Sequence, residues 1–415
     1  MSEVAKKIQQ SVAWEVKSLD TLIEEEVVEL GRGKIISKKD IAETPGHYPI
    51  YSSAKKNEGK FGEYGKYLFD EELITWSVDG GGRLFHREKH KYSVTNVGGF
   101  IRIKQTDIID YKYLFYCLTL LHSQVKFDWV KKAHPSVIRK LYTDIPLPAL
   151  FIQKSIVAKI EELFSHIDAG IEALKRTKQL LKQYRQSVLK SAVTGELTKE
   201  WREKTGVSFD KTWKNLVLGN VAEIIDPNPS HRYPPYDDGD VPLMATKQMV
   251  GEDDWDESTA KLTTSEFYEK RKASHGFKRD DIIFARKGRL GLARRPPKLS
   301  RYAFSHTIFI IRGNEDINSE YLLWFLRREE AISWMLREMN VAAGVPTLGK
   351  AILGKLPLLL PSKEEQNFIA DIIQEKFTVI RRMSENIELQ MLKAEKNKQS
   401  ILVSAYSGVL HRMSA

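Results

Sequence analysis

A long stretch occurs twice in this chain of 415 residues, and the repeat constrains the fold more than any other feature. Residues 148–197 and 361–410 share their pattern at a constant offset of 213 residues, without a gap. A repeat this long does not suit a solenoid, so it predicts a duplicated unit of one domain and its connector. Matched pairs include Pro148 and Pro361, Gln153 and Gln366, Ile160 and Ile373, and Gly195 and Gly408.

The repeated stretch has the pattern of a long helix. Apolar residues between Ile156 and Val188 recur at steps of four and three, the spacing of a coiled-coil heptad. Gly170 and Thr177 weaken this series, and polar residues interrupt the second copy. Pro148 precedes the run and Gly195 follows it, as helix start and stop signals do. Residues 156–193 would span about 57 Å at about 1.5 Å per residue.

We expect the two helices to pair as an antiparallel coiled coil and to hold the globular segments apart. The alternative is that each helix packs on its own globular neighbour as ordinary core. The residues expected at the helix–helix contact are Ile156, Ile160, Leu163, Ile167, Leu174, Leu181, Ile369, Ile373, Phe377, Ile380, Ile387 and Ile401.

Composition narrows the class of partner. The net charge of +10 and the pI near 9.2 favour an acidic partner such as nucleic acid. The single Cys117 excludes a disulfide framework and a cysteine-rich zinc site. Neither a signal peptide nor an apolar run long enough for a bilayer is found in the sequence, so the cytoplasm is the expected compartment.

The globular segments are predicted to be α+β. In the first, strands are expected at residues 48–51, 73–78 and 100–103, and a helix carries Tyr113 and Leu118 on its apolar side. Residues 1–13 have the pattern of a short amphipathic lead-in. The predicted segments are a first recognition domain at 1–147, a helix at 148–198, a linker at 199–212, a second recognition domain at 213–360 and a helix at 361–415.

The two globular segments diverge while their helices stay similar. Trp14 returns as Trp213 at an offset of 199, whereas Tyr113 returns as Tyr321 at 208. The drift indicates insertions in the second segment. Two different targets on one scaffold would explain this pattern.

These residues carry a resemblance to a known family. Ile145-Pro146-Leu147-Pro148, then Gln153, and a helix ending in residues 191–198 resemble the central region of the specificity (S) subunits of type I restriction-modification systems. Residues 48–53 and 93–96, with Trp76, are similar to one class of target recognition domain in that family. The family commonly has a Glu-Gln pair before each helix. The second copy keeps Glu365, and the first has Ile152 instead.

The resemblance implies a subunit that reads DNA and has no catalytic activity of its own. Each globular segment would read one half of a split DNA site, and the helices would fix the unread spacer. Adenine methyltransferase (M) subunits, commonly two, would dock on the helices and flanks, and restriction (R) subunits would join them. S-adenosylmethionine, Mg²⁺ and ATP would belong to those partners, so no cofactor is expected here.

Clustered basic and polar residues are the candidates for DNA contact, because Arg and Lys bind phosphates while Arg, Asn and Gln can read base edges. In the first half they are Ser52, Lys55, Lys56, Asn57, Lys60, Arg83, His86, Arg87, Lys89 and Lys91. In the second half they are Lys247, Gln248, Arg286, Lys287, Arg289, Arg294, Arg295, Lys298, Arg301 and Lys350.

Two enzyme motifs are incomplete. Residues 344–350 have the glycines and lysine of a phosphate loop, but Ala351 replaces the hydroxyl residue that would hold Mg²⁺. Residues 234–236 match part of the amino-methyltransferase tetrapeptide, but Tyr233 stands in place of Asn or Asp. The histidines show no metal-ligand spacing.

Two other functions stay open from the sequence. A free-standing DNA-binding regulator with a coiled-coil spacer is one, and co-purification with an M subunit would separate it from a specificity subunit. A fused DNA methyltransferase is the other. It would need a cofactor pocket and a full catalytic tetrapeptide.

Overall fold

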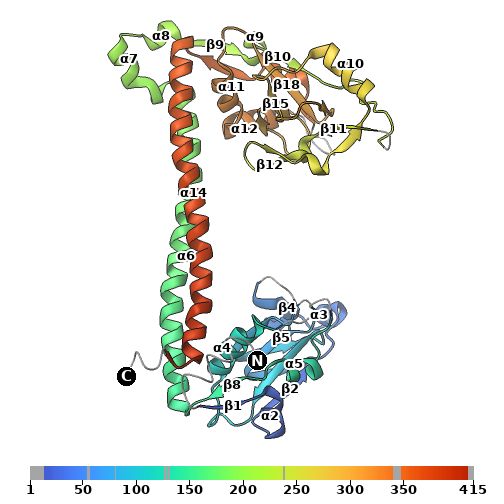
Figure 1. Cartoon of the computed structure of the whole chain (residues 1–415), viewed down its shortest axis with the longest axis vertical. Coiled ribbons are helices and arrows are strands. Elements are labelled where there is room, and N and C mark those ends of the chain that lie inside the picture. Colours follow the sequence, from blue (N-terminus) through green and yellow to red (C-terminus); the bar gives the residue numbers. More distant parts are fainter. Residues whose placement is uncertain are drawn as a thin grey trace. The chain divides into compact units, whose positions relative to one another are not determined.

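The chain forms two compact units in the computed structural model, which describes residues 14–53, 57–79, 81–125, 128, 131–236, 239–339 and 347–409 (Figure 1). Unit 1 comprises the described residues of Met1–Lys175 and Glu388–Ala415, and unit 2 comprises those of Arg176–Ile387. The boundary between the units falls within both long helices. The expected lead-in at residues 1–13 lies outside the described residues.

Unit 1 is built on a six-stranded sheet in the order β2-β7-β5-β6-β3-β4. β3 and β6 are parallel, and the other neighbours are antiparallel. The apolar side of α4 is buried against the sheet, with Tyr113 and Leu118 fully covered. The strands are β2 (Val28–Arg32), β3 (Tyr48–Tyr51), β4 (Lys60–Tyr64), β5 (Phe69–Ser77), β6 (Leu84–Val94) and β7 (Gly98–Ile103), and the helices are α2 (Leu19–Glu24), α3 (Lys38–Glu43), α4 (Tyr111–His122) and α5 (Pro135–Leu141).

All three strands expected in this unit are present. Residues 48–51 coincide with β3, and residues 100–103 lie within β7. β5 begins four residues before the expected 73–78 segment and ends at Ser77. The early start follows from pairing with β6, because Phe69 and Glu71 have partners on that strand.

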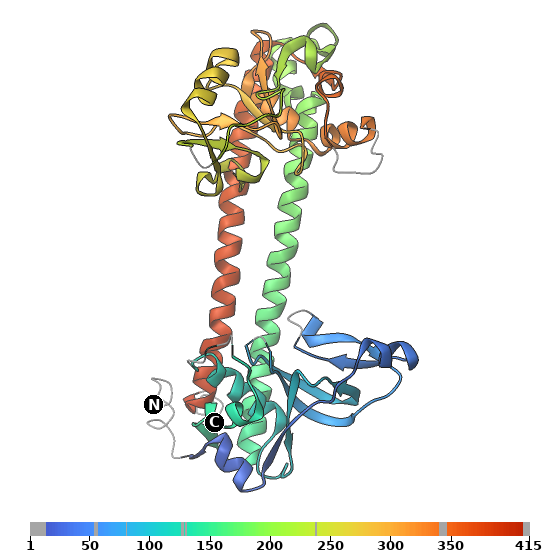
Figure 2. The same cartoon turned by 90° about the vertical axis from the view of Figure 1, so that its right-hand side faces the viewer.

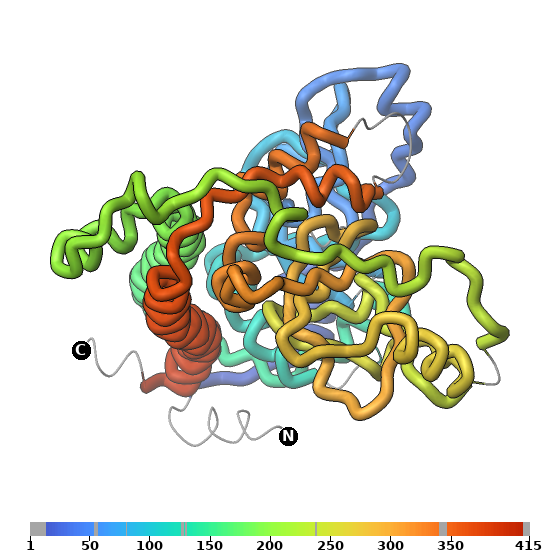
Figure 3. The backbone as a smooth tube through the Cα atoms, turned by 90° about the horizontal axis from the view of Figure 1, so that it is seen from above, coloured from blue at the N-terminus to red at the C-terminus, as the bar shows by residue number. Residues whose placement is uncertain are grey.

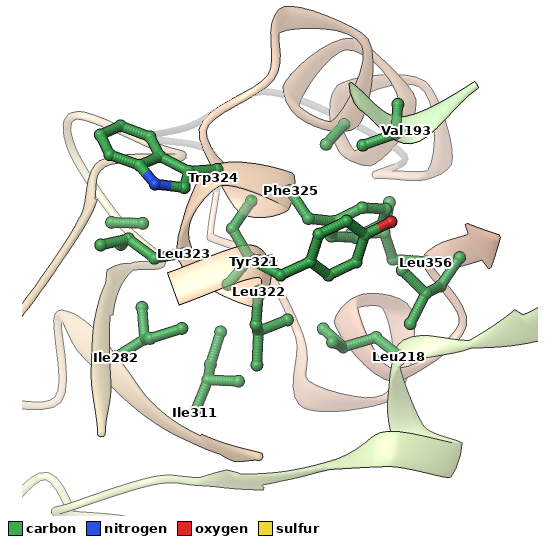
Figure 4. Packing of buried hydrophobic residues seen from close by; sticks show 14 of the residues in the cluster. Val193, Leu218, Ile282, Ile311, Tyr321, Leu322, Leu323, Trp324, Phe325 and Leu356 are labelled. Carbon is green, nitrogen blue, oxygen red and sulfur yellow. The ribbon is translucent and has the colours of Figure 1, made fainter. Parts of the chain in front are cut away.

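In the described part of unit 2 the two larger sheets are β10-β18-β15-β16 and β14-β11-β17, and β12 pairs with β13 as a two-stranded sheet. β11 and β17 are parallel, as β3 and β6 are in unit 1. Tyr321 and Leu322 of α11 lie in the core against Ile282 and Ile311 of the first sheet (Figure 4). The strands are β10 (Ala222–Ile225), β11 (Val241–Met244), β12 (Met249–Val250), β13 (Asp254–Trp255), β14 (Lys261–Thr263), β15 (Ile282–Ala285), β16 (Ala293–Arg294), β17 (Ala303–Phe304) and β18 (Ile308–Gly313), and the helices are α9 (Leu218–Val221), α10 (Ser265–His275), α11 (Ser319–Leu326), α12 (Glu329–Glu338) and α13 (Lys350–Gly354).

The two repeats form helices α6 (Leu150–Val193) and α14 (Lys363–Tyr406), each of 44 residues (Figure 2). In unit 1, Ile156 and Ile160 of α6 share a buried cluster with Leu402 and Ala405, near the end of α14. In unit 2 the end of α6 and the start of α14 share another cluster, which includes Leu189. The start of each helix therefore packs beside the end of the other, and the predicted antiparallel pairing is confirmed.

The expected contact residues differ in burial. The alternative packing holds as well, since the same clusters include core residues of the globular parts. Near the expected but exposed Gly170, Ile171 is the buried residue. Buried members are Ile156, Ile160, Ile369, Ile373, Phe377, Ile380 and Ile387, and partly exposed members are Leu163, Ile167, Leu174, Leu181 and Ile401.

One buried glutamine joins each long helix to the domain before it. The side-chain Oε1 of Gln153 accepts from the Asp110 amide at 2.9 Å, and its Nε2 donates to the carbonyls of Ile108 at 2.8 Å and Pro148 at 2.9 Å. Gln366 makes the equivalent three bonds in unit 2. Both side chains are fully buried.

Short strand pairs complete this junction. In unit 1, β1 (Glu15–Lys17) pairs with β8 (Ile145–Leu147), and Tyr113 donates to the Pro146 carbonyl at 2.9 Å. In unit 2, β9 (Lys214–Val217) pairs with β19 (Pro357–Leu360), and the Tyr321 hydroxyl donates to the Leu359 carbonyl at 3.1 Å. The two halves therefore use the same joint.

The segment predicted as a linker contains α7 (Lys199–Thr205) and α8 (Phe209–Thr212), traced in light green in Figure 3. Glu365, at the start of α14, is fully buried there. It forms an ion pair with Arg202 at 2.5 Å and accepts from the Thr198 hydroxyl at 2.6 Å and from Nε1 of Trp213 at 2.9 Å. The linker is thus fixed to α14 within unit 2.

Candidate nucleic-acid interface

Each unit has a turn of three residues that follows a strand with a parallel partner and leads into the next strand along the chain, from β6 to β7 in unit 1 and from β17 to β18 in unit 2. In unit 1 this turn is residues 95–97, called the first corner. The Thr95 amide donates to the Tyr51 carbonyl at 2.9 Å, and the Val78 amide donates to the Val97 carbonyl at 2.9 Å. These bonds tie the corner to the ends of β3 and β5.

In unit 2 the equivalent turn is residues 305–307, called the second corner. The Ser305 amide donates to the Met244 carbonyl at 2.9 Å, and the Arg286 amide donates to the Thr307 carbonyl at 3.0 Å. A third bond also matches. The Ala133 amide donates to the Val78 carbonyl at 2.8 Å in unit 1, and the Leu348 amide donates to the Arg286 carbonyl at 2.9 Å in unit 2. The two corners have the same main-chain scaffold and different side chains.

Part of the expected DNA-contact set lies at these corners. In unit 1, Ser52 accepts a hydrogen bond from the Thr95 hydroxyl at 3.0 Å, and the exposed Arg83 follows β5, where its carbonyl accepts from Ser77. Asn57, also exposed, lies before β4. Exposed groups therefore surround the first corner, where a polyanion could reach them.

The second corner gathers more of the expected cations. The exposed Lys247 follows Thr246, which donates its amide to the Thr307 hydroxyl at 3.1 Å. Lys287 pairs in a β-bridge with Thr347, and Arg289 donates to the Thr246 carbonyl at 2.9 Å. The exposed Lys350 begins α13, two residues after Leu348.

Other expected residues are exposed or half-buried, but the structure does not bring them to a corner. Lys60, His86, Arg295 and Arg301 are engaged with the acidic residues Glu63, Glu72, Glu320 and Asp240. Lys89 and Lys91 project from β6 where it pairs with the start of β5, and Lys298 lies on an exposed loop. Lys55 and Lys56 lie outside the described residues.

A third group is buried or half-buried and bonded inside its domain. Arg87 is 4% exposed and donates to the Thr75 hydroxyl, and Arg294 is 1% exposed and donates to main-chain carbonyls including Val250. Burial lowers the pKa of Arg87, and it lowers the pKa of Arg294 to about 10. Gln248 bonds Thr259, and Arg286 bonds Asp226 at 2.7 Å. These side chains are bonded within their domains, and of this group Arg286 also bonds the second corner, through its main chain.

The structure also brings together residues that the sequence did not single out for DNA contact. In the first corner, the Asn96 carbonyl accepts from Nε of Arg32 at 3.1 Å. In the second, Nδ1 of His306 lies 2.7 Å from the Tyr233 hydroxyl, and the ring stacks on His231 with centroids 4.4 Å apart. These partners are far apart in the sequence, so no local pattern indicates them.

The incomplete enzyme motifs occupy ordinary loops. Residues 344–346 lie outside the described residues, and the rest of that motif leads into α13. Tyr236 lies beside Lys261, whose Nζ is 4.2 Å from the ring centroid. Among the described residues, no group of His, Cys, Asp or Glu is arranged to hold a metal ion. No described helix is long and apolar enough to cross a bilayer.

Comparison with known proteins identifies the family. The family model described as "Type I restriction modification DNA specificity domain" matches residues 12–182 and again residues 210–390. The specificity subunit of restriction enzyme MpnII from Mycoplasma pneumoniae is 31% identical over 160 residues, covering 37% of this chain and 47% of that one. The StySPI specificity subunit from Salmonella potsdam is 24% identical over 280 residues, covering 64% and 58%. The chain spans about half the length of the relatives that it matches.

A solved structure agrees with the fold. It is described as bearing on complex assembly and conformational transition of the type I R-M system, and it superposes with a TM-score of 0.64 at 14% identity. The match covers 92% of this chain and 98% of the other. Since the family model matches both halves, and so most of the sequence, the chain belongs to the family of specificity subunits of type I restriction-modification systems.

Proposed function

We propose that this chain selects the DNA site of a type I restriction-modification enzyme and has no catalytic activity of its own. Each recognition domain reads one half of a bipartite site. The observation that carries the proposal is the pair of corners, in which one main-chain scaffold presents different polar side chains in the two units. A duplicated scaffold with different reading groups suits an asymmetric, split target.

The chemistry of the corners suits DNA. Exposed Lys247, Lys350 and Arg83 offer charge to phosphates, which supplies affinity without sequence preference. Neutral groups such as Asn96 and His306 can exchange hydrogen bonds with base edges in the major groove. The exposed members of the expected set therefore remain the proposed DNA contacts, and the buried ones act through the scaffold.

The paired helices are proposed to set the number of unread base pairs between the half-sites. Each is 44 residues long, or about 66 Å at about 1.5 Å per residue. One turn of B-DNA advances about 34 Å, so a rod of this length suits a split site.

Methyltransferase subunits are proposed to dock along the helices. Apolar side chains there are exposed, among them Leu180, Tyr184 and Met383. Restriction subunits join through that assembly, and S-adenosylmethionine, Mg²⁺ and ATP act in those partners. The cytoplasm is the proposed compartment, because the host DNA lies there.

Single-molecule methylation mapping of the host genome, with and without this chain, tests the function. Deletion is expected to abolish methylation at one split adenine site, and re-expression should restore it. A genome whose adenine methylation is unchanged by deletion would contradict the proposal. Failure of a methyltransferase subunit to co-purify would favour a free-standing regulator instead.

Exchange of one domain tests the division of labour. Replacing residues 14–146 with the recognition domain of another specificity subunit should change one half-site and leave the other half and the spacer unchanged. Changes in both half-sites would show that the domains do not read independently. Methylation mapping supplies the readout here too.

A further inference from the structure

Resting on the proposed function, we infer that the middle residue of each corner determines specificity for one base of its half-site. This residue is Asn96 in unit 1 and His306 in unit 2. Asn96 suits an adenine, because an amide can bond both N6 and N7 of that base. His306 suits a base edge that needs one hydrogen bond.

The scaffold holds both residues in the same place. The residue before each is tied through its amide to the end of the parallel partner strand, at 2.9 Å in both units. The residue after each is tied through its carbonyl, at 2.9 Å to Val78 and at 3.0 Å to Arg286. Among the described residues, the middle residue of each corner forms no main-chain to main-chain bond with the neighbouring strands, so its side chain can vary without changing the scaffold.

The polar side-chain groups of Asn96 are available. Its main-chain carbonyl accepts from Arg32, and none of the described residues forms a hydrogen bond with its side-chain amide. The side chain is partly exposed at the domain surface. Both the donor and the acceptor of the amide can therefore meet a base.

The ring of His306 is held in one orientation. The Tyr233 hydroxyl lies 2.7 Å from Nδ1 and accepts from the His306 amide at 2.9 Å. His231 stacks on the ring at 4.4 Å with an interplanar angle of 27°. The backbone φ of His231 is +53°, which is unusual for a residue other than glycine, and such outliers concentrate at functional sites. Nε2 has no hydrogen-bond partner among the described residues, so it is the atom offered to a base.

The charges around His306 also suit contact with a base edge. Burial, His231, Lys287 and Arg286 together lower the pKa of the imidazole, so the ring is neutral near pH 7. A neutral ring can donate or accept at Nε2 according to its tautomer. Lys287 and the exposed Lys247 lie beside the second corner and can bind the flanking phosphates.

The test uses the intact enzyme complex carrying His306→Ala or Asn96→Ala, with methylation mapping of every variant site. Each substitution should relax one position of one half-site, lowering discrimination at that position about tenfold or more, in line with the loss of a specific base contact. His306→Ala and Asn96→Ala should affect opposite halves. His306→Asn, which keeps a polar group, should change the preferred base rather than abolish preference.

The controls separate recognition from folding. His47 is an exposed histidine just before β3, at the end of that strand opposite the first corner, and His47→Ala should leave the site unchanged. Thermal melting of each purified variant should match the parent chain. An unchanged site in His306→Ala and Asn96→Ala, or equal loss at both half-sites in a folded variant, would overturn the inference. Failure of the proposed function is distinct, since the unmodified chain would then direct no split site at all.

Discussion

At the scale of single residues, Glu365 is a buried charge that helps to fix the fold of unit 2. Its carboxylate is fully buried and meets Arg202, Thr198 and Trp213, all three from or beside the linker. A buried charge is tolerated only when its partners replace the lost water. The carboxylate therefore fixes the path of the linker, and the family resemblance at this position acquires a physical reason.

Replacing Glu365 with Ala should destabilise unit 2 by about 3–5 kcal/mol, because Arg202 is left buried without its partner. Chemical denaturation of the purified chain measures the loss. Glu161→Gln is the matched control, since its ion pair with Lys112 is partly exposed and should matter little. Equal stability of Glu365→Ala and the parent chain would contradict this role.

His122 makes unit 1 sensitive to acid. Its ring nitrogens lie 2.9 Å from the Tyr142 hydroxyl and 3.0 Å from the Gly81 carbonyl, and burial lowers the pKa of its imidazole. The unfolded chain binds the proton near the usual pKa of about 6.5 and the folded chain binds it only below that value. Stability is therefore full above about pH 6.5 and falls as the pH drops toward the folded-state pKa.

The denaturation midpoint of unit 1 should accordingly decrease as the pH is lowered from 7.5 to 5.5. His122→Gln should make the midpoint less dependent on pH. Hydrogen exchange of α4 amides locates the effect in unit 1. A steeper pH dependence in the variant would contradict the assignment.

At the scale of elements, the joint between each domain and its long helix is the repeated part. Gln153 and Gln366 each bond an amide at the start of a domain helix and two carbonyls, one of them at the proline before the long helix. A glutamine side chain has both donor and acceptor, so one residue satisfies groups on two segments. This dual demand explains why glutamine occurs in both copies.

Gln153→Ala should destabilise unit 1, and Gln366→Ala unit 2, by about 1–3 kcal/mol each, because buried main-chain groups lose their partners. Hydrogen exchange resolves the two units, and each variant serves as the control for the other. A uniform loss of protection across both units in either variant would count against two separate joints.

At the scale of the whole molecule, the long helices connect the two units of the chain. Each unit contains the start of one long helix and the end of the other, so both helices belong to both units. The proposed function uses this arrangement as a ruler. The length of this ruler would then depend on helix residues that touch neither corner.

Removing seven residues from each helix, 172–178 and 385–391, should shorten the unread spacer and leave both half-sites unchanged. Seven helical residues rise about 10 Å, which corresponds to about three base pairs of B-DNA. Methylation mapping reads the spacer directly. A spacer of unchanged length in a folded variant would exclude the ruler. As a control, deletion in one helix alone should impair folding, because the two helices then no longer pair in register.

Sequence patterns were enough to predict the repeat, the two long helices and the α+β halves, since these depend on local periodicity and on the start and stop signals around Pro148 and Gly195. It also showed that the second half carries insertions, from the drift between Trp213 and Tyr321. The spacing of apolar residues suffices for such features, because a helix or strand buries one face whatever lies opposite it.

Which polar residues are accessible to a ligand became clear from the packing of the folded chain. Arg87 and Arg294 look like surface cations in the sequence and are buried, while the role proposed for Asn96 and His306 depends on main-chain bonds between their corners and strands far away in the chain. The apolar series also continues past Gly170 through Ile171. Burial and hydrogen bonding depend on which segments meet in space, and a one-dimensional pattern contains no record of those meetings.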